Sequence, residues 1–203
     1  MMHNSSSPDW LSKPLKVILL FSVLLMILIA FGTFFDLVTG IGMFFIYIIS
    51  YFHTLIIVLP ILLIKKFGAG TSVYVPSALI GLFVEYYMEW MREPVLISPW
   101  CVVGWSVIFL AVGFSADVIY RILPDQMHER NRAILTGLFM EVIHFVLILV
   151  AVSFFYIPVP DGESFLSAAY FGLPWLMINS IFGGYTAYAL SLKVKSEKTK
   201  VIE

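Results

Sequence analysis

Six apolar segments, each long enough to cross a lipid bilayer, constrain the fold of this chain more than any other feature. They occupy residues 15–35, 37–64, 71–91, 99–121, 132–157 and 165–192. An α-helix needs about 20 apolar residues to span the hydrocarbon core. Because lipid offers no partner for backbone N–H and C=O groups, such runs are expected to be helical. The sequence therefore predicts an all-α, polytopic membrane protein with a bundle of six transmembrane helices.

The composition agrees with this class and excludes several others. Of the 203 residues, 61% are hydrophobic and 12% are charged, which is typical of an integral membrane protein. A net charge of −1 without a basic patch predicts no nucleic-acid partner. Cys101 is the single cysteine, so neither an intramolecular disulfide nor a CxxC motif is available.

The basic residues predict the orientation of the bundle. With six spans, eleven of the twelve lysines and arginines fall on one side, and only Arg92 falls on the other. Because basic loops stay in the cytoplasm, both termini are expected there, in a multi-pass protein of the cell membrane. We divide the chain into an N-terminal tail (1–14), a transmembrane domain (15–192) and a basic C-terminal tail (193–203), with both tails cytoplasmic.

The most polar part of the apolar sequence is the end of the third segment. Glu85, Glu89 and Arg92 stand at helical positions i, i+4 and i+7, so they share one face of a helix. Ionisable groups inside a span are expensive and indicate function. If the span ends early, however, the two glutamates are ordinary solvated residues.

Other polar side chains fall near the middle of their segments: His53 in the second, Glu141 and His144 in the fifth, and Asn179 in the sixth. These residues could bind a ligand, or they could form hydrogen-bonded pairs that only hold helices together. Tryptophans at the outer ends fit either a ligand site or an interfacial belt. We expect a substrate-binding pocket formed by Glu85, Glu89, Trp90, Trp100, Glu141, His144, His53 and Asn179.

Three chemistries fit these residues. An acidic, aromatic pocket suits a small cationic or heteroaromatic ligand, because carboxylates neutralise its charge and rings stack on it. A metal-ion carrier could use His53, Glu141 and His144. An intramembrane metal-dependent hydrolase that uses Glu141, His144 and His53 is the minor alternative. Glu85-x-x-x-Glu89-x-x-Arg92 loosely resembles the EExxxR box of membrane CAAX-type proteases, with Glu141 and His144 as the other half of such a site.

Three sequence features resemble the S components of energy-coupling factor (ECF) vitamin transporters. These are the stretch KKFGAGTSVYVPSALIGLFVEYYMEW at 65–90, the Gly104-containing fourth segment that closes on a basic turn, and the last helix with Gly183-Gly184. The likeness is nearest to the branch that takes up thiamine or its hydroxymethylpyrimidine precursor.

This resemblance implies a binding subunit without ATPase activity and without a cofactor. It also implies a transmembrane coupling protein and two ATP-binding subunits as partners. By this resemblance, Glu85 and Glu89 would bind the positive or hydrogen-bond donor groups of the ligand, and Trp90 and Trp100 would stack on it.

Overall fold

The computed structural model describes residues 14–39, 42–76, 78–79, 99–155 and 162–202. The regular structure of these residues is helical throughout, which confirms the all-α prediction. The helices are α1 (Pro14–Thr39), α2 (Gly42–Ile64), α4 (Pro99–Ile122), α5 (Glu129–Phe155) and α6 (Gly162–Ile202). Residues 69–76 and 78–79 are also helical and lie between α2 and α4.

Two of the described helical stretches, Pro14–Gly32 and Glu129–Val150, are long and apolar enough to cross a membrane. Ile49–Ile64 is a shorter apolar helix. Large apolar side chains of α1, such as Leu15, Ile27 and Phe31, point out of the protein. In water such a surface would be unfavourable, so its exposure supports association with lipid.

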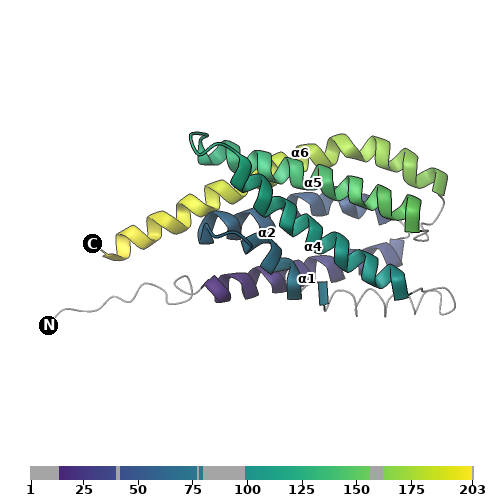
Figure 1. Ribbon diagram of the computed structural model, residues 1–203, viewed down its shortest axis with the longest axis horizontal. Helices are drawn as coiled ribbons and strands as arrows, with labels where there is room; N and C mark the ends of the chain where they lie inside the picture. The colour runs from purple at the N-terminus through teal and green to yellow at the C-terminus, as the bar shows by residue number, and fades with distance from the viewer. Residues whose placement is uncertain (1–13, 40–41, 77, 80–98, 156–161, 203) are drawn as a thin grey trace.

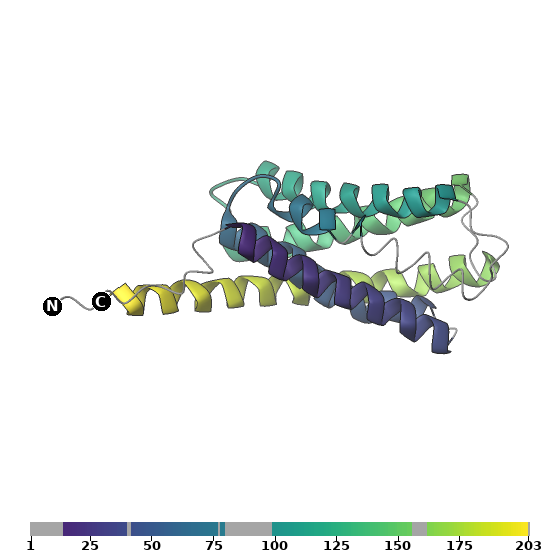
Figure 2. The same cartoon turned by 90° about the horizontal axis from the view of Figure 1, so that it is seen from below.

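Helix α2 lies at the centre of the bundle and contacts α1, α4, α5 and α6 (Figures 1 and 2). Ile57, Val58 and Leu62 on this helix are fully buried. Its C-terminal end is at Ile64, where Lys65 adopts the left-handed conformation with φ 55°. The central position of α2 makes its polar residues part of the interior.

Small residues allow α6 to approach α2 closely. A Cβ atom on Gly183 would lie 2.6 Å from the carbonyl oxygen of Tyr51. Ala187 and Ser191 follow at four-residue intervals on α6, and both are buried. These small residues therefore form a packing surface on α6, as expected for helices that meet within a membrane.

Asp117 caps the start of a neighbouring helical segment. Its Oδ1 accepts a hydrogen bond from the Gly70 N–H (3.0 Å), and its Oδ2 accepts bonds from the N–H (2.8 Å) and hydroxyl (2.6 Å) of Thr71. The first N–H groups of a helix lack intrahelical partners, and the helix dipole favours a negative charge there. This buried carboxylate therefore fixes α4 against the 69–76 segment.

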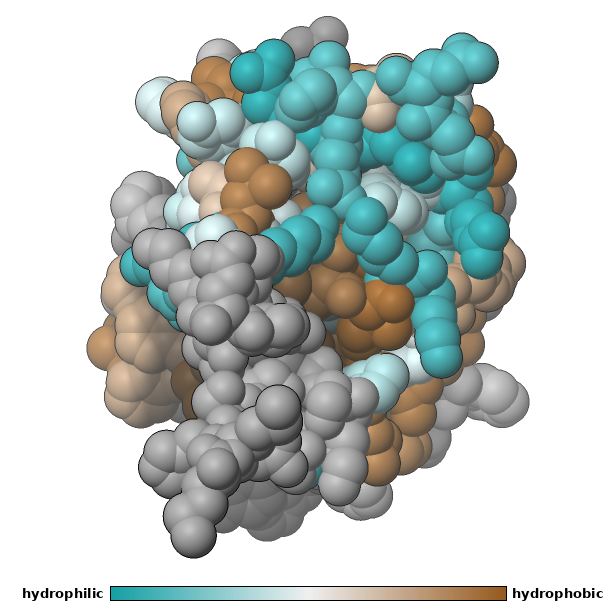
Figure 3. Space-filling model, turned by 90° about the vertical axis from the view of Figure 1, so that its left-hand side faces the viewer, coloured by the Kyte–Doolittle hydropathy of each residue, from teal (hydrophilic) through white to brown (hydrophobic). Residues whose placement is uncertain are grey.

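The helix ends that carry basic residues lie together at one end of the bundle (Figure 1), and hydrophilic residues gather on that surface (Figure 3). Glu129 pairs there with Lys65 (2.9 Å) and Lys195 (3.2 Å). The Glu129 carboxylate raises the pKa of Lys65, mainly through their hydrogen bond. We call this surface the polar end.

Helix α6 is longer than its apolar segment. It continues through the predicted basic tail to Ile202 and projects beyond the other helices (Figures 1 and 2). Residues 185–202 contain neither glycine nor proline, and they include several strong helix formers such as Ala, Leu, Lys and Glu. The helix therefore persists where the hydrophobic pattern ends.

We predict that Gly183→Ala lowers the thermal stability of the purified protein in detergent. The new methyl group would overlap a backbone oxygen that cannot move without shifting α2, at a cost of about 1–3 kcal/mol. Ala189→Val enlarges an exposed position on the same helix and should leave the melting temperature nearly unchanged. Equal melting temperatures for Gly183→Ala and the wild type would contradict this close approach.

Candidate functional site

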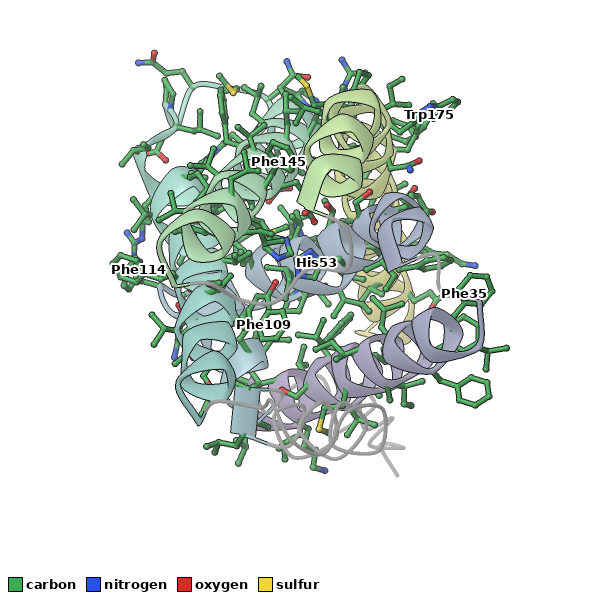
Figure 4. All side chains as sticks on the ribbon, turned by 90° about the vertical axis from the view of Figure 1, so that its right-hand side faces the viewer. Phe35, His53, Phe109, Phe114, Phe145 and Trp175 are labelled. Carbon is green, nitrogen blue, oxygen red and sulfur yellow. The ribbon has the colours of Figure 1, made fainter. Side chains whose placement is uncertain are left out.

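His53, Glu141 and His144 meet inside the bundle. The Nδ1 atom of His53 lies 2.5 Å from Oε1 of Glu141, and Nδ1 of His144 lies 3.2 Å from Oε2. Glu141 and His144 are three residues apart on α5 and so lie on one side of that helix. His53 comes from α2, and Figure 4 shows it in the interior of the bundle. Three residues predicted from two separate segments therefore form one site.

Two further residues complete this site, and sequence reasoning missed both. The Tyr74 hydroxyl forms a hydrogen bond with Nε2 of His53, and Thr54 Oγ1 donates to Oε1 of Glu141 at 3.2 Å. Both side chains are fully buried. A buried tyrosine hydroxyl usually finds a partner, but the burial of Tyr74 and Thr54 is known only from the fold. We call His53, Thr54, Tyr74, Glu141 and His144 the polar cluster.

Burial sets the chemistry of the polar cluster. Glu141 is 1% exposed and His53 is 4% exposed. The His144 side chain, at 16% exposure, is the most accessible member of the cluster. A buried carboxylate is tolerated only when it is paired and hydrogen-bonded. Glu141 meets this condition through three partners: His53, His144 and Thr54.

A single neutral tautomer of His53 satisfies its two hydrogen bonds. With the proton on Nδ1, the ring donates to Glu141, and Nε2 accepts from the Tyr74 hydroxyl. The proton positions follow from this network. The hydrogen bonds thus run unbroken from His144 through Glu141 and His53 to Tyr74.

Aromatic rings form one side of the polar cluster. Tyr74 and Phe109 stack with their centroids 5.9 Å apart and their planes at 18°. The His144 ring lies 5.2 Å from that of His53 and 6.4 Å from that of Phe109. Figure 4 shows Phe109 on α4, below His53 in that view. The site therefore combines hydrogen-bonding groups with flat apolar surfaces.

The same residues include a set of possible metal ligands. One atom from each of His53, Glu141 and His144 can be chosen so that all three lie within 4.8 Å of one another. Imidazole nitrogens and carboxylate oxygens are common ligands of zinc and related ions.

The other predicted site residues remain predictions. Glu85, Glu89 and Trp90 lie outside the described residues, and so does the Arg92 of the protease-like box. Trp100 belongs to the first turn of α4, but its side chain lies outside the described part. Asn179 is half-buried on α6. The hydrogen bonds that define the polar cluster come from α2, α5 and the 69–76 segment.

Comparison with known proteins gives no match for this chain among family models, curated proteins or solved structures.

We predict that Tyr74→Phe destabilises the protein by about 1–3 kcal/mol, because it leaves Nε2 of His53 buried without its hydroxyl partner. Thermal unfolding in detergent measures the loss. Tyr185→Phe makes the same chemical change at a half-exposed position and serves as the control. A Tyr74→Phe protein as stable as the control would show that this hydrogen bond does not hold the cluster together.

Proposed function

We propose that this chain is the substrate-binding S component of an ECF-type uptake transporter, which crosses the membrane six times with both termini in the cytoplasm. The polar cluster would take part in binding a small cationic or heteroaromatic ligand of the thiamine or pyrimidine-precursor class. One observation carries the proposal: Glu141 is buried in an apolar helical bundle beside two imidazoles and a stacked pair of aromatic rings.

A structural role alone accounts poorly for such a site. Replacing buried ion pairs with well-packed apolar residues is often neutral or even stabilising, so folding stability does not require them. Ionisable groups within membrane spans are expensive and are usually functional. Here one carboxylate accepts hydrogen bonds from two different helices, α2 and α5. These facts favour a binding site over simple attachment between helices.

The chemistry of the polar cluster matches the proposed ligand class. A carboxylate can pair with a positive charge or accept a hydrogen bond from an amino group on a heterocycle. Imidazoles can donate or accept hydrogen bonds at ring nitrogens. The stacked Tyr74 and Phe109 rings offer an aromatic surface near these groups. Glu85, Glu89, Trp90, Trp100 and Asn179 are proposed to complete the pocket.

The assignment to S components rests on the sequence resemblance at 65–90, the six apolar segments and the distribution of basic residues. It carries further proposals: a transmembrane coupling protein and two ATP-binding subunits as partners, and no ATPase activity in this chain. Hydrophilic residues gather at the polar end (Figure 3), as the proposed cytoplasmic face would require.

We predict that Glu141→Gln weakens the binding of thiamine or hydroxymethylpyrimidine by about 1–3 kcal/mol, or roughly 5- to 150-fold. The substitution keeps the shape of the side chain and removes its charge. Isothermal titration calorimetry on purified, ligand-free protein measures the affinity. Glu129→Gln is the matched control, because it removes a carboxylate from the same helix at the polar end.

Two results would contradict the proposal. Unchanged affinity in Glu141→Gln would remove the carboxylate from the binding site. A wild-type protein that binds none of the cationic or heteroaromatic vitamins and precursors tested would exclude the ligand class.

A further inference from the structure

The geometry points to a second capacity of the polar cluster: we infer that His53, Glu141 and His144 bind one divalent transition-metal ion of the zinc class. This site requires no heteroaromatic ligand, so it goes beyond the proposed function. It is defined by two nitrogens and one carboxylate that two helices bring together in the interior.

The distances suit a metal ion with a small adjustment. Zinc–nitrogen and zinc–oxygen bonds are about 2.0–2.2 Å, so two ligands of a tetrahedral ion lie about 3.3–3.5 Å apart. The pair formed by His144 Nδ1 and Glu141 Oε2 is already 3.2 Å apart. His53 Nδ1 lies 2.5 Å from the other carboxylate oxygen, Oε1, and would need to move away from it. With one ligand atom taken from each residue, all three lie within 4.8 Å of one another.

The neighbouring hydrogen bonds are those that orient metal ligands. A histidine that binds a metal through one ring nitrogen usually donates its other N–H to a nearby acceptor, which fixes the ring. If His53 binds through Nδ1, its Nε2–H donates to the Tyr74 hydroxyl oxygen, which is already its hydrogen-bond partner. Thr54 similarly holds one oxygen of Glu141. The outer partners are therefore in place for two of the three ligands.

The ligand set also predicts which ions are selected. Magnesium and calcium prefer six or more oxygen ligands, whereas this site offers one carboxylate and two imidazoles. Imidazole suits zinc, copper, nickel and cobalt. With both imidazoles neutral, the cluster carries one formal negative charge, which a cation would compensate. Three protein ligands would leave a fourth position for water or another ligand.

Metal binding to EDTA-stripped protein tests this inference. We expect wild-type protein to bind one Zn²⁺ per chain by elemental analysis after dialysis, and not to retain Mg²⁺. Co²⁺ should give the visible absorption bands of a tetrahedral ion. Glu141→Gln and His144→Gln should each weaken binding at least tenfold, whereas His128→Gln, just before the start of α5, should not.

A second variant tests the metal site without removing a ligand. Tyr74→Phe keeps all three ligands and removes only the partner of His53, so it should lower metal affinity by about 10- to 100-fold. The inference is overturned if stripped wild-type protein binds no Zn²⁺ or Co²⁺. It is also overturned if the Co²⁺ spectrum is the same in wild type, Glu141→Gln and His144→Gln.

The same stripped protein separates this inference from the proposed function. Titration with thiamine and hydroxymethylpyrimidine in the presence of EDTA reports on organic-ligand binding alone. Organic-ligand binding without any Zn²⁺ or Co²⁺ binding overturns the metal site and supports the proposed function. Metal binding without binding of any organic ligand supports the metal site and contradicts the proposed function.

Discussion

The placement of one carboxylate constrains the interior of this protein. Glu141 is buried between α2 and α5, where an unpaired charge would cost several kcal/mol. Its oxygens must therefore meet donors, and these come from His53 and Thr54 on α2 and from His144 on its own helix. These hydrogen bonds join α2 to α5 and place His53, Thr54 and His144 around the carboxylate.

Close helix packing makes this arrangement possible. Gly137 lies one turn before Glu141 on α5, and a Cβ atom there would lie 2.4 Å from the Thr54 methyl group. The missing side chain lets α5 approach α2 at the point where Thr54 reaches the carboxylate. Gly183 permits the corresponding approach of α6 to α2. Small residues that carry no chemistry of their own thus determine the geometry of the site.

The helices were largely predictable from the sequence, because a continuous apolar run has few alternatives to a helix in lipid. The helix boundaries were less predictable. Residues 37–39 belong to α1 rather than to the second segment, and α6 extends ten residues past 192. Hydropathy reports only the apolar part of a helix, whereas intrinsic propensity and the Lys195–Glu129 pair act beyond it.

The site was predictable where ionisable residues interrupt apolar runs, as with His53, Glu141 and His144. Thr54 and Tyr74 could not be assigned in this way, because both residue types are common in apolar helices. Their roles depend on which helices pack together, and a single sequence does not give that information. The two imidazoles and the carboxylate could therefore be predicted because ionisable groups are expensive in an apolar helix. Their hydrogen-bond partners became known only from the fold.

Native mass spectrometry of the protein released gently from detergent tests most directly whether the polar cluster binds a ligand rather than only joining helices. We expect that the wild type, presented with a metal ion or a cationic heteroaromatic vitamin, carries a bound species that a folded Glu141→Gln protein lacks. If only the ligand-free species of both proteins is detected under every such condition, the polar cluster is not a ligand site.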